Sequence, residues 1–257
     1  MTSQIRRIER CSIEEIRAQW DRIAVERDIQ LRSGRDVSFE FVLKPTILDL
    51  IQDADFSSVL DVGCGTGVLA ELLASRAKQV TGVDMSGVSV SIAKASKSCP
   101  PNVRYFSNTV EDYLANTNDR FSLVVANMVL QDSADLSACL ASIASRCRIH
   151  SVLVATITHP WFWPTYWGYD QESWFNYSEE QTIEAPFKIS NDLAPIGTTT
   201  HFHRPLSFYT KRLADVGFQV EIVSEPMPQP EIQMQYPVVW KFPRFLAIRC
   251  RYQGECQ

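Results

Sequence analysis

Residues 60–67 have the composition of a ligand-binding turn between a strand and a helix. They read Leu-Asp-Val-Gly-Cys-Gly-Thr-Gly, after the apolar approach Ser58-Val59-Leu60 and before a helix-like run that begins at Val68. A tight glycine turn at a helix N-terminus lets backbone come close to a ligand while N–H groups point outward. The glycines follow Asp61 with the spacing G-x-G-x-G, whereas dinucleotide sites use G-x-G-x-x-G. The turn therefore predicts a cofactor other than NAD.

A second acidic strand end and three histidines could also do chemistry. Asp84 ends an apolar, strand-like run, and a lone carboxylate has two oxygens that can accept hydrogen bonds from paired hydroxyls. His159, His201 and His203 flank an aromatic-rich segment. A histidine near its usual pKa can take a proton from a hydroxyl, although each of the three could equally be a hydrogen-bonded structural residue.

Alternating strand and helix patterns must position these residues. We expect strands over 59–61, 79–83, 103–106, 121–126 and 151–157, separated by helices over 67–77, 86–98, 110–115 and 134–147. Strands alternating with helices predict the α/β class, a Rossmann-like, doubly wound and mostly parallel sheet with right-handed crossovers. A helix over 206–216 and strands over 218–223 and 245–252 follow, and we expect the last strand to be antiparallel.

The remaining segments are predicted to cap this core. Residues 12–31 have helical spacing behind a Ser12/Glu15 capping box, and 39–51 read as a second helix with Pro45 near its first turn or at a kink. The basic residues that precede them are expected on a solvated helix face. The predicted organisation is an N-terminal helical cap or lid (1–51), a cofactor-binding core (52–158), an inserted, irregular cap with aromatic side chains (159–204) and the C-terminal part of the core (205–257).

Composition narrows the class of protein. The chain has 257 residues, 45% hydrophobic and 21% charged, which suits one α/β domain with insertions. A net charge of −5 argues against a nucleic-acid partner. Seven cysteines without a C-x-x-C pair indicate neither a disulfide framework nor a zinc site, so we expect a reducing, cytoplasmic location and no metal. No apolar run reaches roughly 18 residues and no signal-peptide core is visible, so no membrane partner is expected.

The glycine turn and the strands around it resemble the class I S-adenosylmethionine (SAM) methyltransferases. The resemblance covers about 52–158 and depends on three segments: Leu60-Asp61-Val62-Gly63, Val80-Thr81-Gly82-Val83-Asp84 and Phe121-Ser122-Leu123-Val124-Val125-Ala126-Asn127. It departs from the family at Thr109, where an acidic residue is common, at Ser122 in place of Asp, and before the fifth strand, where a glycine pair is missing. The expected cofactor is SAM.

The resemblance implies roles for individual residues of the core. Asp61 would accept a hydrogen bond from the methionine ammonium, Asp84 would hold the ribose hydroxyls, and Asn127 would lie near the sulfonium. The adenine contact is expected near Thr109 and Glu111, through the Val110 backbone. The full predicted cofactor-binding set is Asp61, Gly63, Cys64, Gly65, Gly67, Asp84, Met85, Thr109, Val110, Glu111 and Asn127.

The substrate side is expected in the inserted cap. Nine of the 17 residues from Trp161 to Tyr177 are aromatic. They could wall a planar or apolar substrate, or could instead form a packed plug or a homodimer interface. The predicted substrate-binding residues are Trp20, Trp161, Trp163, Tyr166, Trp167 and Arg204, the last as a clamp for a carboxylate or phosphate unless it forms an internal salt bridge.

Together these features predict an enzyme, a SAM-dependent methyltransferase that acts on a small organic molecule. Oxygen is favoured as the acceptor over nitrogen or carbon, with His159, His201 or His203 taking the proton. No Asn/Asp-Pro-Pro-Tyr/Phe motif follows the fourth strand, where Asn127-Met128-Val129-Leu130 stands instead. That motif is the usual signature of methylation at exocyclic amines. The alternatives are an N- or C-methyltransferase and a SAM-binding protein without methyl transfer.

Overall fold

A computed structural model describes residues 5–254, and its centre is a seven-stranded sheet with the order β4-β3-β2-β5-β6-β10-β9. The pairs among β4, β3, β2, β5 and β6 are parallel, and β10 is antiparallel to both β6 and β9. The expected mostly parallel, Rossmann-like sheet with an antiparallel last strand is confirmed. Its strands are β2 Val59–Val62, β3 Val80–Asp84, β4 Val103–Ser107, β5 Phe121–Asn127, β6 Cys147–Thr158, β9 Phe218–Ser224 and β10 Phe245–Tyr252.

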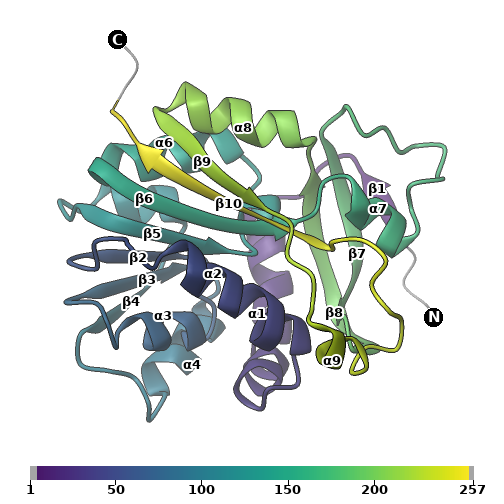
Figure 1. The fold of residues 1–257 in the computed structure, drawn as a ribbon, viewed down its shortest axis with the longest axis horizontal. Coiled ribbons are helices and arrows are strands. Elements are labelled where there is room, and N and C mark those ends of the chain that lie inside the picture. The colour runs from purple at the N-terminus through teal and green to yellow at the C-terminus, as the bar shows by residue number, and fades with distance from the viewer. Residues whose placement is uncertain (1–4, 255–257) are drawn as a thin grey trace.

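Helices cover both faces of this sheet (Figure 1). Alternate strand residues enter different cores: Leu60 and Val124 pack in one apolar cluster, while Val59 and Val125 pack in the other. Burial on both faces explains why the parallel strands are almost entirely apolar. The helices are α1 Ile13–Arg32, η1 Phe39–Leu43, α2 Lys44–Leu50, α3 Val68–Leu73, α4 Gly87–Ala95, α5 Val110–Ala115, η2 Leu130–Asp132, α6 Leu136–Arg146, α7 Phe162–Trp167, α8 Leu206–Asp215 and α9 Pro230–Gln233.

The N-terminal segment follows its prediction with one difference. The Ser12/Glu15 capping box forms at the start of α1, and Pro45 lies in the first turn of α2 behind the π-helical η1. Arg6 and Arg7 do not lie on a helix face, because β1 (Arg6–Ile8) is a strand that pairs with the inserted cap. Residues 1–4 and 255–257, the outer ends of the first and last predicted segments, lie outside the described residues.

The inserted cap is more regular than its sequence suggests. β7 (Gln181–Ile189) and β8 (Asp192–His203) form a long antiparallel hairpin, and β1 completes a three-stranded sheet. Because proline is rare inside sheets, Pro186 made the segment of β7 look unlike a strand in the sequence. It is tolerated because β1 pairs only with Thr182 to Glu184, which leaves β7 an edge strand beyond that point.

Helix α1 joins the core to the cap. It packs on α4 of the core and on β8 of the cap, and Figure 1 shows it between the two. Two polar contacts fix it: the Thr200 N–H donates to Gln19 Oε1 (2.8 Å), and the Ser86 hydroxyl donates to Asp21 Oδ1 (2.6 Å). The space between sheet and cap is therefore closed on one side by α1.

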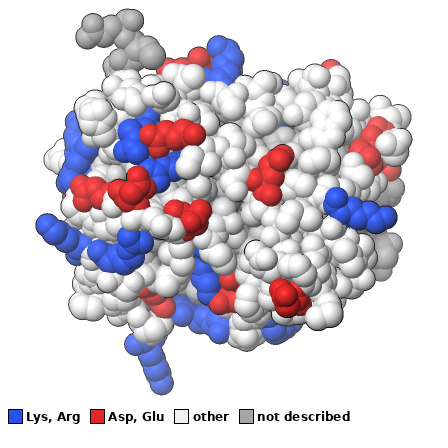
Figure 2. Space-filling model, viewed as in Figure 1, with Lys and Arg blue, Asp and Glu red and all other residues white. Residues whose placement is uncertain are grey.

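The charged surface carries no dominant sign on the face shown in Figure 2. Acidic and basic side chains alternate over it without a single basic stripe. Among the described residues, no helix has the length and apolar character needed to cross a membrane.

Candidate functional site

One large cavity, of about 600 Å³, lies where the carboxyl ends of the parallel strands meet α1 and the cap. Ligands of open α/β sheets bind at such strand ends, beside the point where the strand order reverses. Here the reversal falls at β2, whose neighbours are β3 and β5. The volume lies within the range of small-molecule sites. All the predicted cofactor residues except Gly67 line it: Asp61, Gly63, Cys64, Gly65, Asp84, Met85, Thr109, Val110, Glu111 and Asn127.

The glycine turn presents backbone to this cavity. Gly63 and Gly65 have φ of 64° and 52°, a region that side chains disfavour. A Cβ on Gly63 would also lie 2.4 Å from Val129, whereas a Cβ on Gly65 would meet nothing within 4 Å and so would point into open space. Gly67 faces away, because its added Cβ would lie 2.4 Å from the Tyr105 hydroxyl. Gly63 and Gly65 therefore shape the ligand side of the turn, and Gly67 permits its packing.

Asp61 is an uncompensated acid beneath the turn. Its Oδ2 is buried and has no hydrogen-bond partner. Burial raises the pKa of the Asp61 carboxyl to about 8, and the negative charge of Asp84 adds to the shift. A buried acceptor without a partner calls for a ligand donor, and a cationic ammonium would satisfy both the hydrogen bond and the charge.

Two backbone N–H groups fix the Asp84 carboxylate at the end of β3. Its Oδ2 accepts the Gly65 N–H (2.8 Å) and its Oδ1 accepts the Ser86 N–H (2.7 Å). Burial raises the pKa of Asp84, and these two N–H groups oppose that rise. Each carboxylate oxygen has a second lone pair, so the fixed side chain can still accept from a pair of hydroxyls.

The far end of the cavity lies at the start of α5. Thr109 lines the cavity, and its hydroxyl accepts the Asp112 N–H (3.1 Å) and caps the helix. Glu111 lies beside it, and burial raises its pKa. Across the cavity, Asn127 Oδ1 accepts the Thr156 hydroxyl (2.7 Å), which fixes the end of β5.

These residues fit SAM. The ligand carries an ammonium and a sulfonium, and the core side of the cavity offers the partnerless Asp61 oxygen and the carboxylate of Asp84. The open space in front of Gly65 leaves room for close approach. Among the described residues, no group of three or more His, Cys, Asp or Glu side chains is arranged to hold a metal ion.

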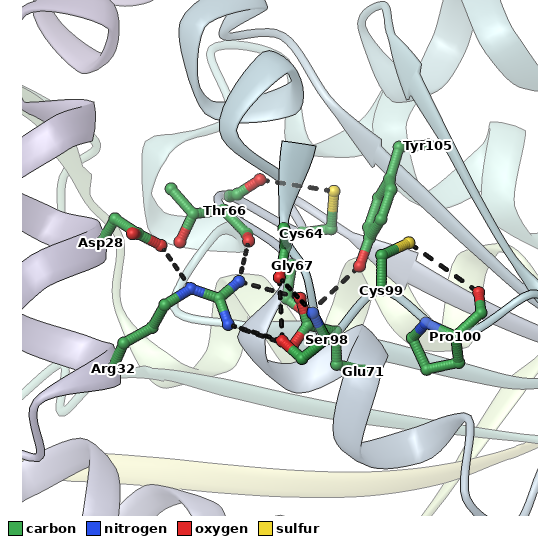
Figure 3. Close-up of polar contacts among 12 residues, drawn as sticks. Asp28, Arg32, Cys64, Thr66, Gly67, Glu71, Ser98, Cys99, Pro100 and Tyr105 are labelled. Carbon is green, nitrogen blue, oxygen red and sulfur yellow. Dashed lines mark hydrogen bonds and ion pairs between the residues drawn. The ribbon is translucent and has the colours of Figure 1, made fainter. Parts of the chain in front are cut away.

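Helix α1 is fastened to the glycine turn by Arg32 (Figure 3). The guanidinium donates to the Thr66 carbonyl (3.0 Å) and pairs with Glu71 of α3 (2.8 Å) and with Asp28 of its own helix (2.8 Å). Because the Thr66 carbonyl belongs to the turn itself, any movement of α1 is coupled to the cofactor end of the cavity.

Aromatic rings wall the cap side. Trp163 and Trp167 contact each other with centroids 5.3 Å apart, and Trp20 of α1 meets Phe187 of β7 edge-on at 5.6 Å. These four line the cavity, as does Phe245. Three of the predicted substrate-binding residues thus lie where a substrate would bind: Trp20, Trp163 and Trp167.

Two other predicted wall residues lie elsewhere. Trp161 is 60% exposed and packs on Tyr177 outside the cavity. Tyr166 covers the Arg244 guanidinium, 3.8 Å from its ring centre. Within the short helix α7, Trp163 and Trp167 are four residues apart and share one face, whereas Tyr166 lies at the edge of that face, where its ring contacts both Trp163 and the Arg244 guanidinium.

Only one of the three predicted catalytic histidines lines the cavity. His201 lies there against Trp167, and burial lowers its pKa to about 3. His159 lies outside: Nε2 contacts Glu225 (2.8 Å), and Nδ1 accepts the N–H groups of Trp161 and Phe162.

His203 also lies outside the cavity. Its Nε2 donates to the Tyr177 carbonyl (3.0 Å). The rings of His159 and His203 thus both form hydrogen bonds outside the cavity, and a catalytic role for either stays a prediction.

Arg204 links segments of the protein to one another and does not act as a substrate clamp. Its side chain is buried, pairs with Glu180, and donates to the carbonyls of Leu130 (3.3 Å) and Ser133 (2.8 Å). It does not line the cavity, but it fixes the segment 130–134, whose residues 131–134 do. The salt-bridge alternative is the one that the structure supports.

Several charged residues that line the cavity were not predicted from the sequence, among them Arg17, Asp132 and Lys188. Asp132 follows β5 in η2, where Gln131 donates to its Oδ2 (3.1 Å) and burial raises its pKa well above the usual value. A polar pair, Gln131 and Asp132, four and five residues after the end of the buried strand β5 was the available signal. Arg17 and Lys188 gave none, since their direction depends on how α1 and β7 pack.

Comparisons with known proteins agree with this geometry. Residues 59–149 match the family model described as "Methyltransferase domain". A ubiquinone biosynthesis O-methyltransferase from Aeromonas salmonicida (strain A449) is 30% identical over 111 residues, which are 41% of this chain and 47% of that protein. The chain thus matches less than half the length of this curated relative.

Solved structures match more of the chain. A protein from Listeria monocytogenes, assigned to the SAM-dependent methyltransferases, is 26% identical with a TM-score of 0.63, covering 80% of this chain and 97% of that one. The structure of DhpI in complex with SAM and HEP has a TM-score of 0.64 at 18% identity, and covers 95% of this chain and 100% of that one. At that identity the second likeness concerns the fold alone.

Proposed function

Because this chain belongs to the class I SAM-dependent methyltransferases, we propose that it transfers a methyl group from SAM to an oxygen atom of a small organic molecule. The proposal is supported by a cavity that joins the acidic strand ends of the core to the aromatic wall of the cap. A cofactor bound at Asp61 and Asp84 and an acceptor bound beside Trp163 and Trp167 would share one enclosed space.

Asp61, Asp84 and the backbone around Gly65 would hold SAM, which supplies an electrophilic methyl group. The protein's own contribution is to place the acceptor oxygen in line with that methyl group and to exclude water, which lowers the barrier through proximity and orientation. The rings of Trp20, Trp163, Trp167 and Phe187 supply the positioning surface.

Oxygen is favoured because the cavity contains groups that can take a proton from a hydroxyl. His201 stays neutral at working pH, but a pKa of about 3 makes it a weak base that mainly accepts a hydrogen bond. Asp132 is the stronger base, since burial raises its pKa. We assign proton removal to Asp132, with His201 orienting the hydroxyl. The name of the curated relative, an O-methyltransferase, favours the same acceptor. The cytoplasmic location and a homodimer stay predictions.

Calorimetry and product analysis test this proposal. We expect SAM to bind the wild-type chain and Asp84→Ala to weaken binding by on the order of 100-fold, because two hydroxyl hydrogen bonds to a charged group are lost. Asp215→Ala on the surface of α8 is the matched control and should bind SAM normally; urea unfolding checks that both variants are folded.

Turnover separates methyl transfer from SAM binding alone. With a panel of hydroxylated small molecules, S-adenosylhomocysteine (SAH) and an O-methyl product should form together. Unchanged SAM binding in Asp84→Ala would overturn the cofactor assignment. Tight SAM binding without SAH formation across the panel would favour a binding protein that performs no transfer.

A further inference from the structure

The cap side of the cavity contains an ammonium group without an acidic partner. Lys188 of β7 is half-buried, lines the cavity, and lies over the Trp167 ring with Nζ 5.5 Å from the ring centre. Within residues 5–254 no carboxylate lies within ion-pair distance of it. We propose that Lys188 binds an anionic group, a carboxylate or a phosphate-type oxyanion, on the methyl acceptor. This inference rests on the proposed function and names its substrate class.

The backbone directs Lys188 into the cavity. In a regular strand alternate residues face opposite sides, yet Phe187, Lys188 and Ile189 all line the cavity. The β7–β8 register shifts between Phe187, which pairs with Gly197, and Ile189, which pairs with Asp192, and this leaves Lys188 without a cross-strand partner. Such irregularities re-aim side chains and are frequent beside functional sites.

The tip of the hairpin is held in place, so this direction is fixed. The Asn191 side chain donates to the Arg35 carbonyl (2.7 Å) and accepts the Val37 N–H (3.3 Å). Lys188 lies three residues from this anchor. It therefore extends from a braced segment of the cap and not from a free loop.

The neighbouring cation is already neutralised. Arg27 lies over Phe187 with its guanidinium carbon 5.0 Å from the ring centre, but it pairs with Asp36 at 3.0 Å. Among the described basic residues that line the cavity, Lys188 and Arg17 have no carboxylate partner. The Arg17 Nε is buried and has no hydrogen-bond partner. The Trp167 ring attracts the Lys188 ammonium but does not neutralise its charge, so the ammonium stays free to pair with an anionic ligand.

Lys188 gives the cap side of the cavity a cation, although the carboxylates of Glu14, Asp132 and Asp135 also line the cavity. Asp61 and Asp84 on the core side suit a cationic cofactor, whereas Lys188 among Trp163, Trp167 and His201 on the cap side suits an anion attached to a planar or apolar body. His201 cannot replace the lysine, since burial keeps it neutral. Opposite charges at the two ends would orient the acceptor relative to the methyl group.

Binding of matched probes to the SAH-loaded protein tests the inference. The anionic probes are 4-hydroxybenzoate and phenyl phosphate, and the neutral counterparts are 4-hydroxybenzamide and phenol. We expect an anionic probe to bind on the order of 10-fold or more tightly than its neutral counterpart, the range of one charge-assisted hydrogen bond. The stronger of the two anions distinguishes a carboxylate from a phosphate-type group.

Three variants complete the test. Lys188→Met keeps the packing on Trp167 without the charge and should abolish the preference, Lys188→Arg should keep it, and Lys211→Met on the surface of α8 should leave it unchanged. SAH binding should be equal in all three. A preference that survives Lys188→Met, equal binding of charged and neutral probes, or no binding of either anion at millimolar concentration would overturn the inference. If the wild-type chain does not bind SAH, this would instead overturn the proposed function.

Discussion

Binding of SAM should release a proton from Asp61. In the free protein this carboxyl lies beneath the glycine turn with a partnerless Oδ2, and burial raises its pKa to about 8. The ammonium of SAM carries a positive charge and needs the ionised carboxylate as its partner. Ligand binding and loss of the proton are therefore linked.

The pKa sets the size of this linkage. With a pKa of about 8, about nine in ten Asp61 side chains carry a proton at pH 7, so binding should release about 0.9 proton. Between pH 6 and 7 the affinity for SAM should rise about ninefold, equivalent to ~1.3 kcal/mol. Near pH 8 the rise should end, because the α-amino group of the ligand begins to lose its own proton at about 7.7–8.0.

Calorimetry in buffers of different ionisation enthalpy measures the released proton directly. Asp61→Asn is the matched variant: it keeps the shape, removes the titration, and should bind SAM weakly without proton release.

The effect of Asp61 on the pH dependence of the free energy of unfolding is opposite to that of an ordinary paired carboxylate. Because the folded pKa exceeds the unfolded value of 3.8, Asp61 stabilises the free protein at low pH, and this contribution is lost as the pH rises towards 8. Asp61→Asn should therefore remain folded and lose less stability over that range. A flat SAM affinity between pH 6 and 7, with no proton released, would show that SAM binding is not linked to the Asp61 proton.

Two further predictions concern catalysis and the attachment of α1. If Asp132 is the base, kcat should rise with pH through its raised pKa, and Asp132→Asn should lower kcat by on the order of 10²- to 10⁴-fold and flatten the dependence of kcat on pH. A steep pH dependence of kcat retained by the variant would exclude this role, since His201 with a pKa of about 3 does not titrate above pH 5. Arg32→Met should weaken SAH binding several-fold and lower the free energy of unfolding by about 1 kcal/mol, because the guanidinium holds Glu71 and the Thr66 carbonyl while solvent screens part of its charge. Calorimetry and urea unfolding measure both quantities for Arg32→Met, and unchanged SAH affinity would show that α1 packs independently of the cofactor end.

The sequence predicted most of the core because the signals there are local. Strand 245–252 and helix 110–115 were expected with the bounds that the structure has, and the capping box formed where Ser12 and Glu15 stand. Apolar periodicity, caps and glycine spacing act within a few residues of one another, so they can be read without knowing the fold.

The cap was less predictable because its order is non-local. The hairpin β7–β8 depends on pairing between residues such as Gln181 and His203, which are far apart in the chain, and Pro186 obscured its pattern. Which histidine faces the cavity follows from that pairing and from the turn after β6. The sequence could name His159, His201 and His203 together but could not choose among them.

Local sequence accounts for the glycine turn, the acids at two strand ends and hence the cofactor family, since a strand, a turn and a helix N-terminus are adjacent in the chain. The side chains that face the acceptor depend instead on how distant segments pack. Packing of α1 and the cap against the strand ends turned Arg204 into a bracket, left His201 alone of the three histidines in the cavity, and aimed Asp132 and Lys188 into it. Side-chain direction at such positions is set by contacts between distant segments, and those contacts exist only once the chain has folded.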